Sequence, residues 1–155
     1  MNTYRQIRTD GTDSDFIALC RLLDENLDEI VGIKFQRSQY ARYNTLEYIH
    51  NVILYYDGST AVAGGSFKKY DDTTAELKRV FVRKEYRGQG IARELVMSLG
   101  QWALSCGYTS MILETGTPLT AAMSLYRSLG YAVIPNYGQY RDMKNSICMR
   151  KALSI

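Results

Sequence analysis

The pattern of apolar and polar residues predicts a short strand and two helices in the first third of the chain. Residues 3–8 predict an opening strand, and residues 10–32 carry apolar side chains three or four positions apart, which predicts an amphipathic helix. Asp13 or Ser14 is expected to cap the N-terminus of that helix. Residues 37–50 repeat the helical spacing with tyrosine, leucine and isoleucine, and they predict a second helix.

The rest of the chain predicts a mixed sheet of the α/β class. Residues 51–82 contain three β segments, and an Asp-Gly turn between the first two favours an antiparallel hairpin. After them we expect a helix, a buried strand, a helix and two closing β segments, over residues 92–107, 108–116, 119–130, 131–140 and 145–153. Because strands joined through a helix run parallel, the sheet is expected to be mixed, with helices on its faces.

The composition limits the class of protein. With 155 residues, 46% of them hydrophobic, the chain is expected to form one domain over residues 1–155. No apolar run is long enough for a membrane span and the polar start is unlike a secretory signal, so no membrane partner is expected. Cys20, Cys106 and Cys148 are odd in number and widely spaced, which argues against disulfides or zinc and favours the cytoplasm. The net charge of +3 lacks a basic run, so we expect no nucleic-acid partner.

A glycine turn between a strand and a helix, in the stretch RKEYRGQGIARELV, predicts an anion site. It is not a P-loop, because no Lys-Ser/Thr pair follows Gly90, and Arg93 stands where a dinucleotide fingerprint needs its third glycine. The remaining pattern is Arg-x-x-Gly-x-Gly/Ala, formed by Arg87, Gly90 and Ala92. Small residues and the helix N-terminus would admit a pyrophosphate. The alternative is a plain strand–helix turn with its charges in solvent.

Two segments together resemble a known family. AELKRVFVRKEYRGQGIARELV and, about thirty residues on, ETGTPLTAAMSLYRSLGYAVI are similar to motifs of the Gcn5-related N-acetyltransferase (GNAT) superfamily. The resemblance covers roughly residues 60–135, and the order of elements fits the same fold. It implies a central mixed sheet of six to seven strands flanked by about four helices. It also implies an N-acetyltransferase that uses acetyl-CoA as co-substrate and no metal.

The resemblance implies how the chain would hold acetyl-CoA. In the family the strand before the loop separates from the next strand, so backbone groups of Val80, Phe81 and Val82 would bind the pantetheine arm and one N–H would serve the oxyanion. The pyrophosphate would lie on Arg87, Gly88, Gln89, Gly90, Ile91 and Ala92. Many relatives have an asparagine where this chain has Leu119, so that contact is absent here or is replaced by Thr115 or Thr117.

The resemblance also implies catalytic roles. Tyr126 matches a family tyrosine near the thioester sulfur and would protonate the thiolate, since the pKa of a phenol, about 10, is near that of a thiol. The alternative is a tyrosine that packs in the core. Glu76 would take the proton of the amine, through water, with Glu114 in reserve. The alternative for Glu76 is an edge glutamate paired with Lys78 or Arg79.

The acceptor is expected to bind outside these motifs, at residues 25–43 and 135–142. Asp28 and Glu29 offer charge for a cationic amine, and Tyr137 and Tyr140 could form an aromatic wall. Ordinary packing is the alternative for both tyrosines. We expect a small-molecule primary amine. A protein or peptide acceptor and a non-catalytic acyl-CoA-binding or sensor module are the alternatives, and both a homodimer and a monomer fit the sequence.

Overall fold

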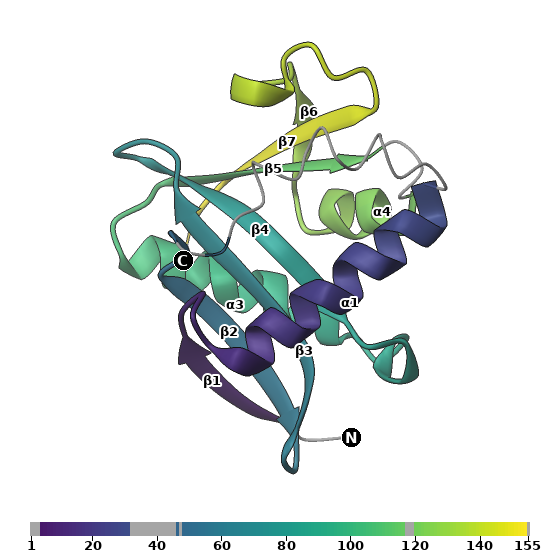
Figure 1. The fold of residues 1–155 in the computed structure, drawn as a ribbon. Coiled ribbons are helices and arrows are strands. Elements are labelled where there is room, and N and C mark those ends of the chain that lie inside the picture. The colour runs from purple at the N-terminus through teal and green to yellow at the C-terminus, as the bar shows by residue number, and fades with distance from the viewer. Residues whose placement is uncertain (1–3, 32–45, 47, 117–119, 155) are drawn as a thin grey trace.

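One mixed sheet organises the protein. The computed structural model describes residues 4–31, 46, 48–116 and 120–154, with side chains left out at 27–31. Its strands are β1 (Arg5–Thr9), β2 (Asn51–Asp57), β3 (Thr60–Lys69), β4 (Thr74–Val82), β5 (Ser110–Gly116), β6 (Ala132–Ile134) and β7 (Ser146–Ala152). They lie in the order β1-β2-β3-β4-β5-β7-β6 (Figure 1). Only β4 and β5 pair in parallel, as the strand–helix–strand pattern predicted.

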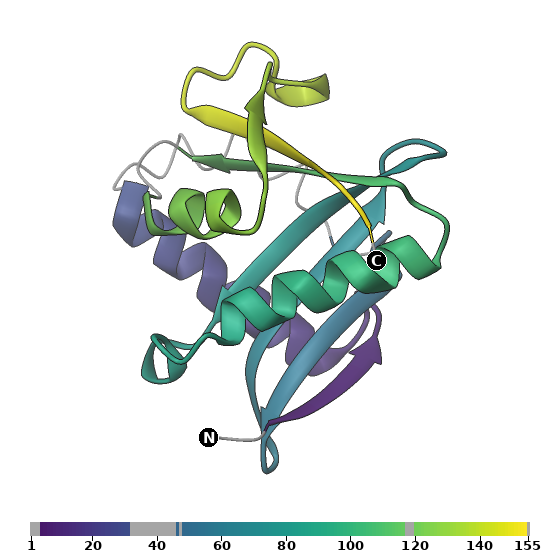
Figure 2. The same ribbon diagram turned by 180° about the vertical axis from the view of Figure 1, so that it is seen from behind.

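Helices cover both faces of this sheet. Helix α1 (Ser14–Val31) crosses one face (Figure 1), and α3 (Ile91–Ser105) and α4 (Thr120–Ser128) pack on the other (Figure 2). Asp13 caps α1, because its carboxylate accepts hydrogen bonds from the backbone N–H groups of Asp15 and Phe16. The sequence allowed either Asp13 or Ser14 as the N-cap residue, and the hydrogen bonds show that it is Asp13.

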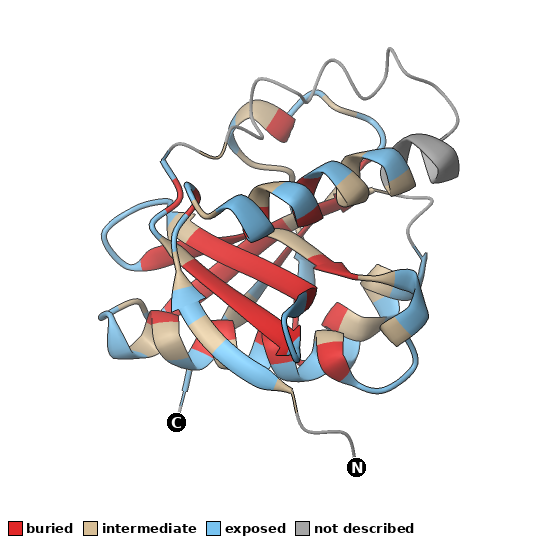
Figure 3. Cartoon of the chain, turned by 60° about the horizontal axis from the view of Figure 1, so that its bottom comes forward, coloured by how far each residue is buried: buried red, intermediate tan, exposed pale blue. Residues whose placement is uncertain are grey.

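Two apolar clusters stabilise the layers. The larger lies between the sheet and α3 and α4, and it includes Leu77, Leu95 and Leu99. The smaller lies under α1 and includes Phe16 and Leu19. The central strands are therefore buried on both faces, which Figure 3 shows in red. Burial on both faces explains the apolar runs in β2 and β3, while β4 also carries the buried polar residues Glu76 and Lys78.

The structure confirms most predicted elements and corrects one. The expected helix over residues 37–50 lies mostly outside the described residues, and Leu46 and Tyr48 belong to a bend and a turn. The β segment expected over residues 131–140 is a strand only at Ala132–Ile134. Beyond it the chain turns into a short 3-10 helix, Gly138–Tyr140, because Pro135 has no N–H for a ladder. No helix among the described residues is long and apolar enough to cross a membrane.

Candidate active site

The strands β4 and β5 separate in the middle of the sheet. They pair from Thr74 with Ser110 to Glu76 with Ile112, and the ladder ends there. Strand β4 continues to Val82, while β5 stays paired with β7 along its other edge. Peptide groups on the facing edges beyond Glu76 therefore have no ladder partner across the gap. The separation that the family resemblance implied is confirmed.

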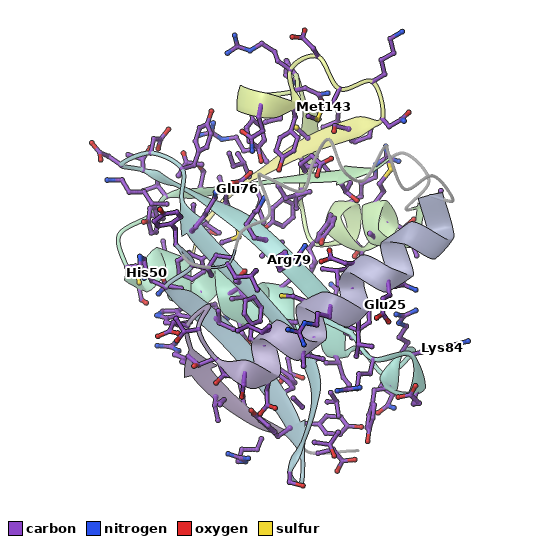
Figure 4. All side chains as sticks on the ribbon, viewed as in Figure 1. Glu25, His50, Glu76, Arg79, Lys84 and Met143 are labelled. Carbon is purple, nitrogen blue, oxygen red and sulfur yellow. The ribbon has the colours of Figure 1, made fainter. Side chains whose placement is uncertain are left out.

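A β-bulge changes the direction of side chains on β4 where the strands separate. The register with β3 shifts between Gly64 and Ser66, and Arg79 has a φ of 60°, the one non-glycine φ above zero among the described residues. After the bulge, the side chain of Val80 lies toward α3. Arg79 lies toward α1, where its guanidinium forms two hydrogen bonds of 2.9 and 3.1 Å with the carboxylate of Asp24 (Figure 4). The bulge thus lies just beyond the end of the β4–β5 ladder and changes which face of β4 the following side chains take.

The glycine turn follows β4 and is open to its surroundings. Gly88 and Gly90 have φ values of 81° and 82°, and a Cβ atom built on either would meet nothing within 4 Å. Gly90 is the N-cap residue of α3, and no side chain caps its first N–H groups. Backbone N–H groups at a helix N-terminus, beside residues of left-handed conformation, bind phosphate oxygens. The loop therefore has the backbone features of a phosphate site.

Basic side chains around the turn differ in their surroundings. Arg87 is exposed, and its Nε donates to the carbonyl of Val82 at 2.9 Å, which anchors the turn to the end of β4. Lys84 extends into solvent (Figure 4). Arg83 is directed away, since its Nε donates to the carbonyl of Ala61 at 2.7 Å. Arg87 and Lys84, on the N-terminal side of the turn, therefore remain accessible to a bound anion.

Glu76 is buried at the last position of β4 that pairs with β5. Its side chain is 3% exposed, and Oε2 accepts a hydrogen bond of 2.6 Å from the hydroxyl of Tyr137. The ammonium of Lys68, on β3, lies 3.9 Å from Oε1. Of the two partners that the sequence offered, Arg79 pairs with Asp24 instead, while Lys78 lies close enough to interact with the charge of Glu76. Glu76 is thus a buried, hydrogen-bonded carboxylate beside the gap.

Lys78 extends this polar cluster. Its ammonium donates to the hydroxyl of Tyr140 at 3.2 Å. Burial lowers the pKa of Lys78, while the nearby carboxylates of Glu76 and Glu114 oppose this effect. Glu114 itself accepts a hydrogen bond of 2.8 Å from Ser146. The sequence contained a signal for Lys78, because residues two apart on a strand share a face, but it gave no sign of Tyr140 as partner.

Tyr126 is buried on α4. Its ring lies edge-on to that of Tyr131, with centroids 5.8 Å apart. Burial, and to a smaller degree the charge of Glu114, raises the pKa of Tyr126 to about 12. Because a free thiol has a pKa of about 8.5, the phenol is a weaker acid than a thiol by about 3 to 4 units. In these surroundings Tyr126 is suited to donate a hydrogen bond rather than to give up its proton.

The remaining predicted residues divide into two groups. Tyr137 and Tyr140 are brought to the polar cluster, where burial raises the pKa of both hydroxyls and the charge of Glu76 adds to this effect. The side chains of Asp28 and Glu29 lie outside the described part of the chain, as do Leu119 and Thr117. Thr115 is described and is buried on β5.

Comparison with known proteins identifies the family. The family profile that matches residues 16–131 is that of the acetyltransferase (GNAT) family. Human N-acetyltransferase 8 is 46% identical over 66 residues, which cover 39% of this chain and 29% of the human protein. An uncharacterized N-acetyltransferase of Schizosaccharomyces pombe is 35% identical over 79 residues, covering 51% of this chain and 48% of that protein. The chain thus matches less than half the length of these curated relatives.

Solved structures share the fold along the whole chain. A putative acyl-CoA N-acyltransferase from Klebsiella pneumoniae superposes with a TM-score of 0.80 at 24% identity, covering 98% of this chain and 99% of that one. A putative acetyltransferase from Salmonella typhimurium, solved with acetyl-CoA, gives a TM-score of 0.67 at 17% identity, covering 99% and 96% of the two chains. These likenesses show the fold, and the family profile, which matches more than half of the chain, shows that the chain belongs to the GNAT acetyltransferase family.

Proposed function

We propose that the protein is an acetyl-CoA-dependent N-acetyltransferase that moves an acetyl group directly to the primary amine of a small molecule. One observation carries this proposal: the part of β4 that has separated from β5 leads directly to the open glycine turn. A ligand that presents amide groups to the strand and a pyrophosphate to the turn would satisfy both. Family membership supports the same conclusion.

The residues present fit the co-substrate. Backbone groups from Val80 to Val82 would bind its amides, and residues 87–92 would bind its phosphates, with Arg87 as the accessible cation. Acetyl-CoA supplies the thioester carbonyl for attack by the amine. An N–H group of β4 after the bulge at Arg79 would donate to the oxygen on which negative charge develops.

Two side chains would act directly on the reacting groups, one on the amine and one on the sulfur. Glu76 would accept the proton that the amine loses, because it is the buried carboxylate closest to the point where the strands separate. Tyr126 would donate a hydrogen bond to the departing sulfur, as its raised pKa of about 12 opposes full proton transfer. Tyr137 and Tyr140 would form the wall beside the acceptor, since both contact the cluster of Glu76 and Lys78.

The position of Glu76 favours a small acceptor. The carboxylate is buried and bonded to Tyr137, so an acceptor would have to place its amine in confined surroundings to reach it. A slender alkylamine or amino acid can do this at a low cost in reorganisation. A peptide acceptor would have to present a side chain or a free terminus in the same way, and it remains the main alternative.

The test is release of free CoA thiol from acetyl-CoA against a panel of amines. The panel contains amino acids, polyamines, aminoglycosides and short peptides, with thermal stabilisation by CoA measured alongside. Turnover with small amines supports the proposal. Turnover with peptides alone would replace the acceptor class. Stabilisation by CoA without any turnover would favour a non-catalytic acyl-CoA-binding module, and a lack of stabilisation would contradict the assignment of the glycine turn.

A further inference from the structure

The segment between β6 and β7 closes over Glu76. Tyr137, its third residue after β6, places its hydroxyl 2.6 Å from Oε2 of Glu76, although the two residues are 61 positions apart. The ring of Tyr137 lies edge-to-face between Tyr70, at 5.2 Å, and Tyr140, at 5.6 Å. Tyr70 is partly exposed and Tyr140 is buried, so the three rings form a row from the surface to the polar cluster.

Asn136 holds this segment in shape. Its side-chain Nδ2 lies within hydrogen-bonding distance of three backbone carbonyls, those of Tyr140 at 3.2 Å, Met143 at 3.3 Å and Ser146 at 3.0 Å. An amide nitrogen has two hydrogens, so these bonds are shared. Met143 marks the outer part of the segment in Figure 4. Because Tyr137 follows Asn136 directly, the hydrogen bonds of the Asn136 side chain also restrict where the hydroxyl of Tyr137 lies.

The hydroxyl of Tyr137 acts on Glu76 as a permanent donor. Burial, with the neighbouring charge of Glu76, raises the pKa of Tyr137, so the hydroxyl keeps its proton across the neutral range. A hydrogen bond donated to a carboxylate favours the charged form, which is the form that can accept a proton from an amine. Other groups around Glu76 are Lys68 on β3, Lys78 on β4, Glu114 on β5 and Tyr140 in the same segment.

We propose that Tyr137 is a positioning residue for acetyl transfer: its hydroxyl orients Glu76 through the hydrogen bond to Oε2, and Asn136 holds Tyr137 in place. This rests on the proposed function, in which Glu76 accepts the proton of the amine. When an amine approaches Glu76, Oε2 already accepts the hydrogen bond from Tyr137. Oε1, which lies 3.9 Å from the ammonium of Lys68 and is not the oxygen that Tyr137 bonds, would receive the proton.

The test is the pH profile of kcat/KM for Tyr137→Phe, with the best amine acceptor of the unaltered protein. We expect kcat to fall roughly tenfold, the size expected for one hydrogen bond to a charged group. The acidic limb of the profile should move to higher pH, because a carboxylate without its donor takes up a proton more readily. The KM for acetyl-CoA should stay unchanged. In a Glu76→Gln background the same substitution should have no further effect on the profile.

Tyr70→Phe is the matched control. It removes a hydroxyl from an exposed ring of the same row, whose side chain forms no hydrogen bond with Glu76, and should leave both rate and profile unchanged. A Tyr137→Phe profile that matches the unaltered protein would overturn the role of Tyr137. A lower kcat without a shift of the acidic limb of the pH profile would also overturn this role, because it would show that Tyr137 contributes only to packing. Absence of turnover by the unaltered protein would instead refute the proposed function.

Discussion

The ion pair between Asp24 and Arg79 connects α1 to the bulge of β4, and its removal tests whether the bulge depends on it. The Arg79 side chain is 7% exposed and that of Asp24 44%, and two hydrogen bonds of 2.9 and 3.1 Å join them. Arg79 also holds a left-handed φ of 60°. For a residue with a side chain this conformation costs about 1–2 kcal/mol, so surrounding contacts must offset it.

The substitution Asp24→Asn removes the charge but keeps the shape of the side chain. Loss of one partner from a fully buried pair costs about 3–5 kcal/mol. Asp24 is half exposed, so solvent weakens the pair, and we expect a loss of about 1.5 kcal/mol in the free energy of unfolding. For a chain of this size that corresponds to a fall in Tm of roughly 3–6 °C. The rate of acetyl transfer should also fall, because the bulge lies just beyond the end of the β4–β5 ladder, next to the backbone proposed to bind acetyl-CoA.

The measurement is urea unfolding and thermal denaturation, with the turnover of both proteins compared under the same conditions. Glu25→Gln is the control, since Glu25 is the next residue on α1, carries the same charge and is exposed (Figure 4). It should change the free energy of unfolding by less than about 0.5 kcal/mol. Equal effects of the two substitutions would refute the reasoning, because the loss would then reflect the net charge of α1 and not the pair with Arg79.

Three further predictions concern the cofactor loop, the leaving group and a buried thiol. Gly90→Ala has room for its Cβ but must adopt a φ of 82°, so we expect thermal stabilisation by CoA to shrink while the free protein loses about 1 kcal/mol; unchanged stabilisation would contradict a phosphate site at the turn. Tyr126→Phe should lower kcat more than it weakens CoA binding, measured by turnover and thermal shift; an unchanged kcat would remove Tyr126 from the reaction. Burial raises the pKa of Cys148 to about 11 from 9.0. The unfolded chain therefore loses this proton first, and stability should fall as pH rises from about 9 to 11, with a smaller fall in Cys148→Ala; equal slopes would show that another group is responsible.

Local sequence patterns were sufficient for most of the elements and for the glycine turn. The Asp-Gly pair predicted the hairpin between β2 and β3, and the glycines after the β4 segment predicted an open loop before a helix. These features depend on backbone conformations that a few neighbouring residues specify, so they can be inferred from a short window. Glu76 and Tyr126 were singled out by their place in the family motifs, and the structure adds their surroundings.

The partners of those residues were decided by the tertiary structure. Glu76 meets Tyr137 from a segment 61 positions away, and Arg79 meets Asp24 from 55 positions away, across the bulge. The β segment expected over residues 131–140 ends at Ile134. Pro135 cannot donate to a ladder, and the side chain of Asn136 bonds to carbonyls up to ten residues ahead, which stabilises a turn. The sequence by itself determined the order of strands and helices and the chemistry offered at the loop. Which side chains meet at the gap depended on packing across the sheet, because such contacts form between segments whose separation along the chain carries no local signal.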